Sequence, residues 1–194
     1  QGQPDWLQLQ HLCAYELGFC YFFSLDFVKS SAYWARLEKE NTWSKGFFAY
    51  MQGICEMSSD HGLTKTANES DADFKKRLWS AQQNAAPPIL SKVESLVTRK
   101  FGGKPLAIEA FVVHRSNMFV KENRRPAIPE LEMIYLFYGF IQMSEPLLDK
   151  SLQMVDTVLR DARSPRPDGG QPLTTEEVAL VLLVRAAILK ALHR

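Results

Sequence analysis

The stretch LCAYELGFCYFF, residues 12–23, decides the fold of this chain. Every side chain in it is apolar or aromatic except those of Glu16 and Gly18, and its length suits about three turns of helix. A helix that is apolar on nearly all sides expects neighbours on more than one side. The stretch therefore predicts a covered helix, and it raises the question of what covers it.

Helical patterning extends over the rest of the chain. Apolar residues recur with 3.6-residue spacing, whereas hairpin signals and sustained alternation are absent. Helices are expected at about 6–24, from Asp26 onward, from Asn41 or Thr42 to about 59, at 72–84, from Pro87-Pro88 to Gly102-Gly103, and at 106–121, 129–144, 147–162 and 175–193. The sequence therefore predicts an all-α protein with at least about 60% helix and no sheet.

An internal repeat favours a helical array over a simple bundle. Three residues of the first helix return in the same order at an offset of 35: Tyr15, Gly18 and Cys20 recur as Tyr50, Gly53 and Cys55. A glycine inside a helix costs about 1 kcal/mol relative to alanine, so its return suggests close helix packing. The offset is near the roughly 34-residue period of tetratricopeptide arrays. We expect a single tetratricopeptide-like domain over 1–194, an α-solenoid of stacked antiparallel helix pairs.

Composition and charge narrow the possible partners and locations. The net charge of +1 gives no electrostatic case for nucleic acid or an anionic membrane. Three cysteines without metal spacing predict buried, reduced thiols. There is no signal peptide, and the longest apolar run, residues 178–192, is interrupted by Arg185 and Lys190. We expect a soluble intracellular protein without a membrane span.

The residues that commonly carry catalysis or bind metals lack the spacing that such chemistry needs. His11, His61, His114 and His193 are scattered, with no second ligand at metal-binding distance. Gly102-Gly103-Lys104 lacks the flanking residues of a phosphate-binding loop and predicts a helix end. We expect no catalytic residue, no metal site and no cofactor, and therefore a protein that is not an enzyme.

A basic cluster near position 120 has two readings, an anion-binding site and a solvated helix end. Its members are Arg115, Lys121, Arg124 and Arg125, with Glu122 among them. Because exposed ion pairs of this kind contribute little, we expect a solvated helix end.

Three blocks of the sequence resemble one protein family. Leu17-Gly18-x-x-Tyr21 is similar to the centre of a tetratricopeptide first helix, and YWARLEKENTWSKGFFAYMQGIC (33–55) resembles a segment of the tetratricopeptide repeat protein 39 family. That family includes the fungal inclusion-body-clearance proteins. KFGGKPLAIEAFV (100–112) and IPELEMIYLFYGF (128–140) resemble two later blocks of the same family, in the same order.

The resemblance implies a role and a place in a larger protein. It implies a non-enzymatic scaffold or adaptor that acts in inclusion-body clearance and proteostasis, linked to lipid droplets or lipid homeostasis, in the cytoplasm and also in the nucleus. It also implies that the chain is the C-terminal part of a longer protein, since family members carry a large helical N-terminal region. Expected partners are other proteins, among them lipid-droplet-associated ones, and the rest of its own full-length chain.

The tetratricopeptide resemblance also implies which residues line a concave groove. Counted from the two glycines, the groove positions are Leu12, Tyr15, Phe19, Phe22, Phe23, Phe47, Tyr50, Ile54, Met57 and Ser58. All but Ser58 are apolar, so the groove is expected to be covered. Arrays that bind a chaperone's C-terminal carboxylate place Lys and Asn where this chain has Tyr15 and Phe19, so that partner class has no support.

Three occupants of this apolar groove remain open. A helix of the same protein fills it in the first reading, from the N-terminal region or from the C-terminal helix at 175–193. In the second reading it receives an amphipathic helix of a partner. In the third it is a pocket for an apolar small molecule such as a sterol, so that the protein is a lipid carrier or sensor.

Overall fold

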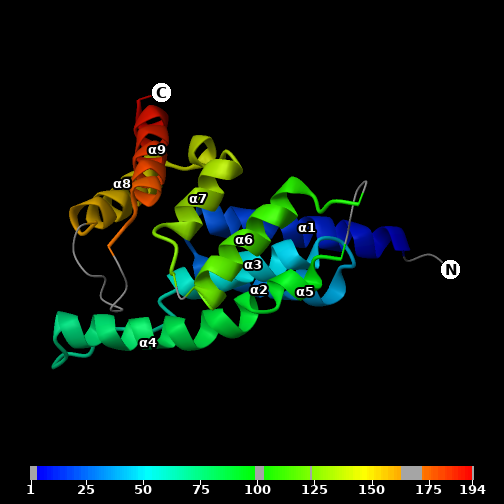
Figure 1. Ribbon diagram of the computed structural model, residues 1–194, viewed down its shortest axis with the longest axis horizontal. Coiled ribbons are helices and arrows are strands. Elements are labelled where there is room, and N and C mark those ends of the chain that lie inside the picture. Colours follow the sequence, from blue (N-terminus) through cyan, green and yellow to red (C-terminus); the bar gives the residue numbers. More distant parts are fainter. Residues whose placement is uncertain (1–3, 99–102, 123, 163–171, 194) are drawn as a thin grey trace. The chain divides into compact units, whose positions relative to one another are not determined.

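The computed structural model describes residues 4–98, 103–122, 124–162 and 172–193, and it confirms an all-α protein (Figure 1). Helices hold 75% of the described residues, and no strand occurs among them. The helices are α1 (Pro4–Phe23), α2 (Phe27–Glu40), α3 (Lys45–Ser58), α4 (Asp71–Leu90), α5 (Val93–Leu96), α6 (Ala107–Lys121), α7 (Pro129–Leu136), a 3₁₀ turn η1 (Gly139–Gln142), α8 (Glu145–Arg160) and α9 (Thr175–Leu192). No helix in the described ranges is both long and apolar enough to cross a bilayer.

The chain forms two compact units. The first comprises Gln1–Phe22 and Asp26–Arg124 and contains α1 to α6. The second comprises Phe23–Leu25 and Arg125–Arg194 and contains α7 to α9.

Local side-chain caps explain several helix starts. Asp26 accepts a hydrogen bond from the Lys29 backbone N–H at 3.2 Å and begins α2, as the sequence predicted. Ser70 caps α4 in the same way, and Thr174 forms a reciprocal capping box with Glu177 at the start of α9. These caps satisfy backbone donors that have no partner within the first helical turn.

Pro87 and Pro88 do not open a helix as the sequence suggested. They lie in the last turn of α4, where the Ser91 N–H still bonds to the Pro87 carbonyl at 3.0 Å. The helix persists through them because Ala86 and Leu90 are buried on one face. The next helix, α5, ends at Leu96, and the residues before Gly103 where it was expected to stop lie outside the described ranges.

The expected helix at 129–144 is divided in the second unit. Tyr138 takes a left-handed conformation, with φ of 56°, after α7 has ended, and η1 follows it. A Cβ at Gly139 would stand 2.6 Å from the ring of Phe23, so the backbone approaches that ring too closely for any larger residue. The break therefore lets the chain pass close to Phe23.

The first unit has the repeated helix pairs that the glycines predicted. A Cβ at Gly18 in α1 would stand 2.9 Å from the Trp34 ring of α2, and one at Gly53 in α3 would stand 2.4 Å from Leu90 of α4. In both pairs, a glycine of the first helix receives a large side chain of the second. The pairs α1–α2 and α3–α4 are therefore equivalent.

The same register continues from one pair to the next. The Tyr15 ring meets Phe48 of α3 at 6.4 Å between centroids, and the equivalent Tyr50 ring meets Phe111 of α6 at 6.3 Å. Thus α3 follows α1 as α6 follows α3. This arrangement is that of a helical-repeat array.

In the second unit, α8 and α9 pack along one another. Leu148, Ser151 and Val155 of α8 are buried, as are Val181 and Val184 of α9. Arg185 closes the edge of this pair with a 2.7 Å bond from its Nε to Asp156 Oδ1. Leu182, one turn before Arg185 on α9, is about half exposed.

Candidate functional site

The structure distributes the nine apolar residues of the predicted groove unequally. Six of them are buried within the chain itself: Phe19, Phe22, Phe47, Tyr50, Ile54 and Met57. Tyr15 and Phe23 are half-buried, and Leu12 is 55% exposed. Phe23 belongs to the second unit. Of the nine, Leu12 and Tyr15 thus remain accessible to another molecule on the first unit.

Aromatic contacts within the first unit cover much of the groove. The Trp34 ring of α2 lies edge-to-face with Phe19 at 5.0 Å and with Phe47 at 6.1 Å, and Phe111 of α6 covers Tyr50. Edge-to-face pairs at these distances stabilise a core beyond the area that they bury. The middle of the predicted groove is therefore part of the hydrophobic core.

An open hollow of about 680 Å³ lies beside the accessible end of the groove. The first half of α1, the end of α2, the segment leading to α3, and α3 itself supply its lining: Leu7, Gln8, His11, Leu12, Tyr15, Glu40, Asn41, Thr42, Trp43 and Phe48. We call it the α1–α2 hollow. Its volume falls within the about 300–1,000 Å³ that is usual for ligand pockets.

The turn between α2 and α3 shapes one wall of the hollow. The Asn41 N–H caps α2 by bonding to the Leu37 carbonyl at 3.0 Å, and Asn41 Oδ1 accepts the Trp43 N–H at 2.8 Å. Ser44 then takes a left-handed conformation, with φ of 52°. This backbone path delays the start of α3 relative to the sequence prediction and leaves Trp43 47% exposed at the rim.

One corner of the hollow is polar and contains the Glu40 carboxylate. Arg36 Nε donates to Glu40 Oε2 at 2.9 Å, and this bond, with the nearby charge, lowers the pKa of Glu40. His11 Nε2 lies 3.5 Å from the same oxygen and makes no hydrogen bond among the described residues. The hollow thus combines apolar walls with an ionised carboxylate that accepts hydrogen bonds.

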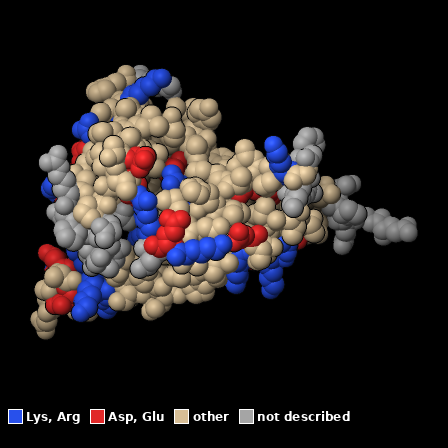
Figure 2. All heavy atoms as spheres, viewed as in Figure 1, with Lys and Arg blue, Asp and Glu red and all other residues tan. Residues whose placement is uncertain are grey.

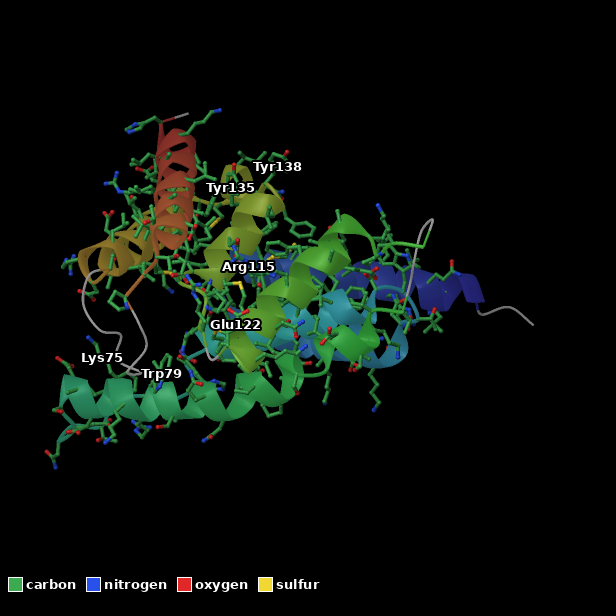
Figure 3. The ribbon with its side chains drawn as sticks, viewed as in Figure 1. Lys75, Trp79, Arg115, Glu122, Tyr135 and Tyr138 are labelled. Carbon is green, nitrogen blue, oxygen red and sulfur yellow. The ribbon has the colours of Figure 1, made fainter. Side chains whose placement is uncertain are left out.

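The structure does not group the other candidate residues, the possible metal ligands and the basic cluster near position 120, into a site among the described residues. Among the described residues, no three His, Cys, Asp or Glu side chains are grouped as metal ligands would be. Arg115, on α6, stacks over the Phe111 ring, whereas Lys121 pairs with Glu94 of α5 at 2.6 Å, and Glu122 follows the end of the helix (Figure 3). Arg115 and Lys121 therefore have local partners within α6 and α5.

The charged surface is mixed. On the face drawn in Figure 2, Lys and Arg side chains lie next to Asp and Glu side chains, over the described residues, without forming a broad patch of one sign. This distribution agrees with the net charge of +1.

The prediction of three buried thiols is wrong for two of them. Cys55 is buried in α3, whereas Cys13 and Cys20 are exposed on α1. Cysteine is usually a buried residue, but Cys13 and Cys20 lie on a side of α1 that is exposed in the described part of the chain.

Sequence reasoning also missed eight of the ten residues that line the hollow, among them His11, Glu40 and Trp43. His11 and Glu40 come from different helices, and Trp43 comes from the turn that follows α2. The exposed tryptophan beside Asn41 was the available signal, because asparagine commonly organises a turn by bonding to the N–H two residues on.

A family model matches almost the whole chain. The family is described as Iml2/Tetratricopeptide repeat protein 39, and its model matches residues 1–192. No solved structure matches the chain.

Proposed function

Because the chain belongs to the Iml2/Tetratricopeptide repeat protein 39 family, we propose that it is a non-enzymatic scaffold that binds protein partners. The observation that carries this proposal is the α1–α2 hollow, whose apolar walls include Leu12 and Trp43. Both side chains are about half exposed, at 55% and 47%. Amphipathic helices dock in such apolar grooves by inserting a few large side chains.

The polar corner of the hollow defines the chemistry of the partner. The Glu40 carboxylate favours a cationic or hydrogen-bond-donating side chain close to the apolar anchor. We propose an amphipathic segment that places a Lys or Arg within one turn of a large apolar residue. This partner differs from the C-terminal carboxylate of a chaperone, which Glu40 would repel.

The family resemblance is the basis for a more specific proposal about the cellular role. We propose that the chain acts in inclusion-body clearance and proteostasis linked to lipid droplets, in the cytoplasm and also in the nucleus. Both compact units then belong to one tetratricopeptide-like domain, the C-terminal part of a longer protein.

Affinity capture with a matched pair of variants tests the scaffold. Leu12→Asp places a charge in the hollow, whereas Val28→Asp changes another side chain that is about half exposed, on α2 outside the hollow. Partners that bind the hollow are retained by the wild type and by Val28→Asp and lost by Leu12→Asp. Equal recovery by all three chains, with unchanged melting temperatures, contradicts the assignment.

A second candidate is a sterol or another apolar lipid in the same hollow. The volume of about 680 Å³ and the mostly apolar lining favour it. Saturable sterol binding by the purified chain, abolished by Leu12→Asp and kept by Val28→Asp, supports this candidate against a scaffold that binds proteins alone. Absence of saturable binding removes it.

A further inference from the structure

One face of α1 is apolar and open along its length. It carries Trp6, Leu9, Cys13, Leu17 and Cys20, which recur at the three- and four-residue spacing of a single helix face. All five are exposed, and the leucines at 9 and 17 are 50% and 40% exposed. We call this set the outer stripe of α1. It is distinct from the α1–α2 hollow, because none of its residues lines the hollow.

The repeat register identifies the same face on α3. At the offset of 35, Cys13 corresponds to Phe48 and Cys20 corresponds to Cys55. Both counterparts on α3 are buried, at 1% and 0% exposure. Two residues of the outer stripe, Cys13 and Cys20, are therefore exposed on α1 and buried where they recur on α3.

The preceding helix covers this face of α3. The Phe48 ring stacks on the Trp34 ring of α2, with 6.2 Å between centroids and 16° between planes. Further along, the Ser31 hydroxyl of α2 donates to the Glu56 carboxylate of α3. The face thus serves to stack one helix pair on the pair before it.

The equivalence of the two faces rests on contacts as well as on sequence. Gly18 and Gly53 each receive a large side chain from the second helix of their own pair. Tyr15 and Tyr50 each meet a phenylalanine of the next first helix. Since two other sides of α1 and α3 have matching neighbours, their third sides occupy matching positions in the array.

We propose that the outer stripe of α1 is the seat of a further helix that precedes α1 in the full-length protein and packs on it as α2 packs on α3. The inference rests on the proposal that the chain is the C-terminal part of a longer protein. The short Cys13 side chain leaves more room than Phe48 does, so the incoming helix supplies a bulky apolar side chain there. Stacked repeats bury their apolar faces in this way, with each pair contacting its neighbours.

The two exposed thiols report directly on this contact. In the 194-residue chain, Cys13 and Cys20 are expected to react rapidly with 5,5′-dithiobis(2-nitrobenzoate), while the buried Cys55 is protected. In the longer natural protein, both reactions are expected to slow at least about tenfold, the factor that corresponds to about 1.4 kcal/mol of protection. Cys13→Ser and Cys20→Ser assign the two rates to their residues.

Two variants make the measurement decisive. Ser80→Cys places a thiol at an exposed position of α4, and it should react equally fast in both chains. Leu17→Glu in the longer protein should restore the reactivity of Cys13 and Cys20, because a charge in the stripe opposes helix docking.

Each other outcome overturns the proposal. Equal thiol reactivity in the short and long chains shows that no preceding helix covers the stripe. If the two thiols are already protected in the short chain, something other than a preceding helix covers the stripe. Protection that increases with protein concentration indicates a second copy of the chain, and protection that does not indicates the second unit. Because the thiols lie outside the hollow, partner capture by the hollow can fail or succeed independently of this result.

Discussion

The indole of Trp34 lies directly against Gly18, and a chain of two hydrogen bonds fixes it there. Trp34 Nε1 donates to Ser30 Oγ at 2.8 Å, and Ser30 Oγ donates to the Gly18 carbonyl at 2.9 Å. Both Trp34 and Ser30 are fully buried. The glycine thus provides the space for the ring and the acceptor that orients its polar edge.

Gly18→Ala is expected to destabilise the protein although alanine is the better helix former. The new Cβ would stand 2.9 Å from Trp34 Cζ2 and 3.1 Å from two further ring atoms, and a rigid ring cannot yield locally. Overpacking costs about 1–3 kcal/mol, and the gain in helix propensity offsets about 1 kcal/mol of that. We expect a net loss of about 1 kcal/mol in the free energy of unfolding, measured by urea denaturation.

The control for this variant is an exposed helix position. Ala32→Gly in α2, where the side chain is exposed, should cost about 1 kcal/mol through propensity alone. If Gly18→Ala instead raises the stability by the same amount, the packing equivalence of Gly18 and Gly53 is wrong.

Ser30 and Trp34 are expected to be coupled in a double-mutant cycle. Ser30→Ala leaves the buried indole N–H without its acceptor, a loss of about 1–3 kcal/mol. In the Trp34→Phe background the N–H is absent, so the same Ser30→Ala change should cost about 1 kcal/mol less. Urea denaturation of the four proteins provides the measurement. Strictly additive effects would show that the Trp34–Ser30 bond contributes nothing to stability.

The fold was predictable because its signals are local or repeat at a fixed distance. The 3.6-residue spacing predicts the helices, and the recurrence of Gly18 as Gly53 predicts where pairs pack closely. The position of Pro87 was not predictable in this way. The sequence around Pro87 is compatible both with a helix that begins at the proline and with a helix that ends shortly after it. The burial of Leu90 decides between these two structures.

Much of the candidate site depended on information that local sequence does not contain. The groove residues were chosen by analogy with other arrays, and the structure places most of them in the core. The hollow depends on the left-handed turn at Ser44, which no glycine marks, and on His11 meeting Glu40 from another helix. Likewise, whether Cys13 is exposed depends on a neighbouring helix rather than on its own residue type.

The buried and accessible parts of the predicted groove should respond differently to truncation. Ile54 is fully buried, so Ile54→Ala should lower the free energy of unfolding by about 2–5 kcal/mol. Leu12 is 55% exposed, so Leu12→Ala should change it by no more than about 0.5 kcal/mol. Denaturation curves of the two variants test this contrast. A large loss for Leu12→Ala would place its side chain in the core and outside the hollow.

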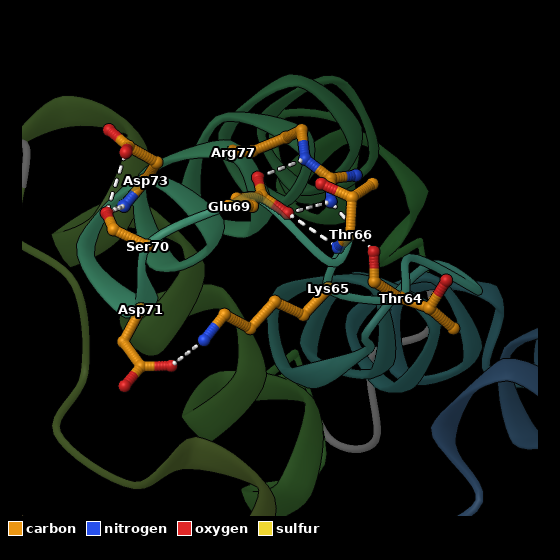
Figure 4. Close-up of polar contacts among 8 residues, drawn as sticks. All are labelled: Thr64, Lys65, Thr66, Glu69, Ser70, Asp71, Asp73 and Arg77. Carbon is orange, nitrogen blue, oxygen red and sulfur yellow. Dashed lines mark hydrogen bonds and ion pairs between the residues drawn. The ribbon is translucent and has the colours of Figure 1, made fainter.

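The turn before α4 should weaken in acid because of one carboxylate. Arg77 donates from Nε and Nη2 to the two oxygens of Glu69, at 2.9 and 2.8 Å, and from Nη2 to the Thr64 carbonyl (Figure 4). The Thr66 N–H also donates to Glu69. These bonds lower the pKa of Glu69 from 4.5 to about 2, and the hydrogen bonding from Arg77 is the largest cause.

The sign of the pH effect follows from this lowered pKa. A carboxyl group with a lower pKa in the folded state contributes stability above its unfolded pKa, and the contribution is lost as the pH falls through the folded value. The melting temperature of the wild type should therefore exceed that of Glu69→Gln near neutral pH, and the gap should close between pH 4.5 and about 2. Arg77→Gln is the matched control, because it removes the largest cause of the lowered pKa, and it should flatten most of the profile while the Thr66 N–H and Lys65 still act on Glu69. A gap between wild type and Glu69→Gln that stays constant from pH 7 to 2 would mean that the Arg77 pair does not link this turn to pH.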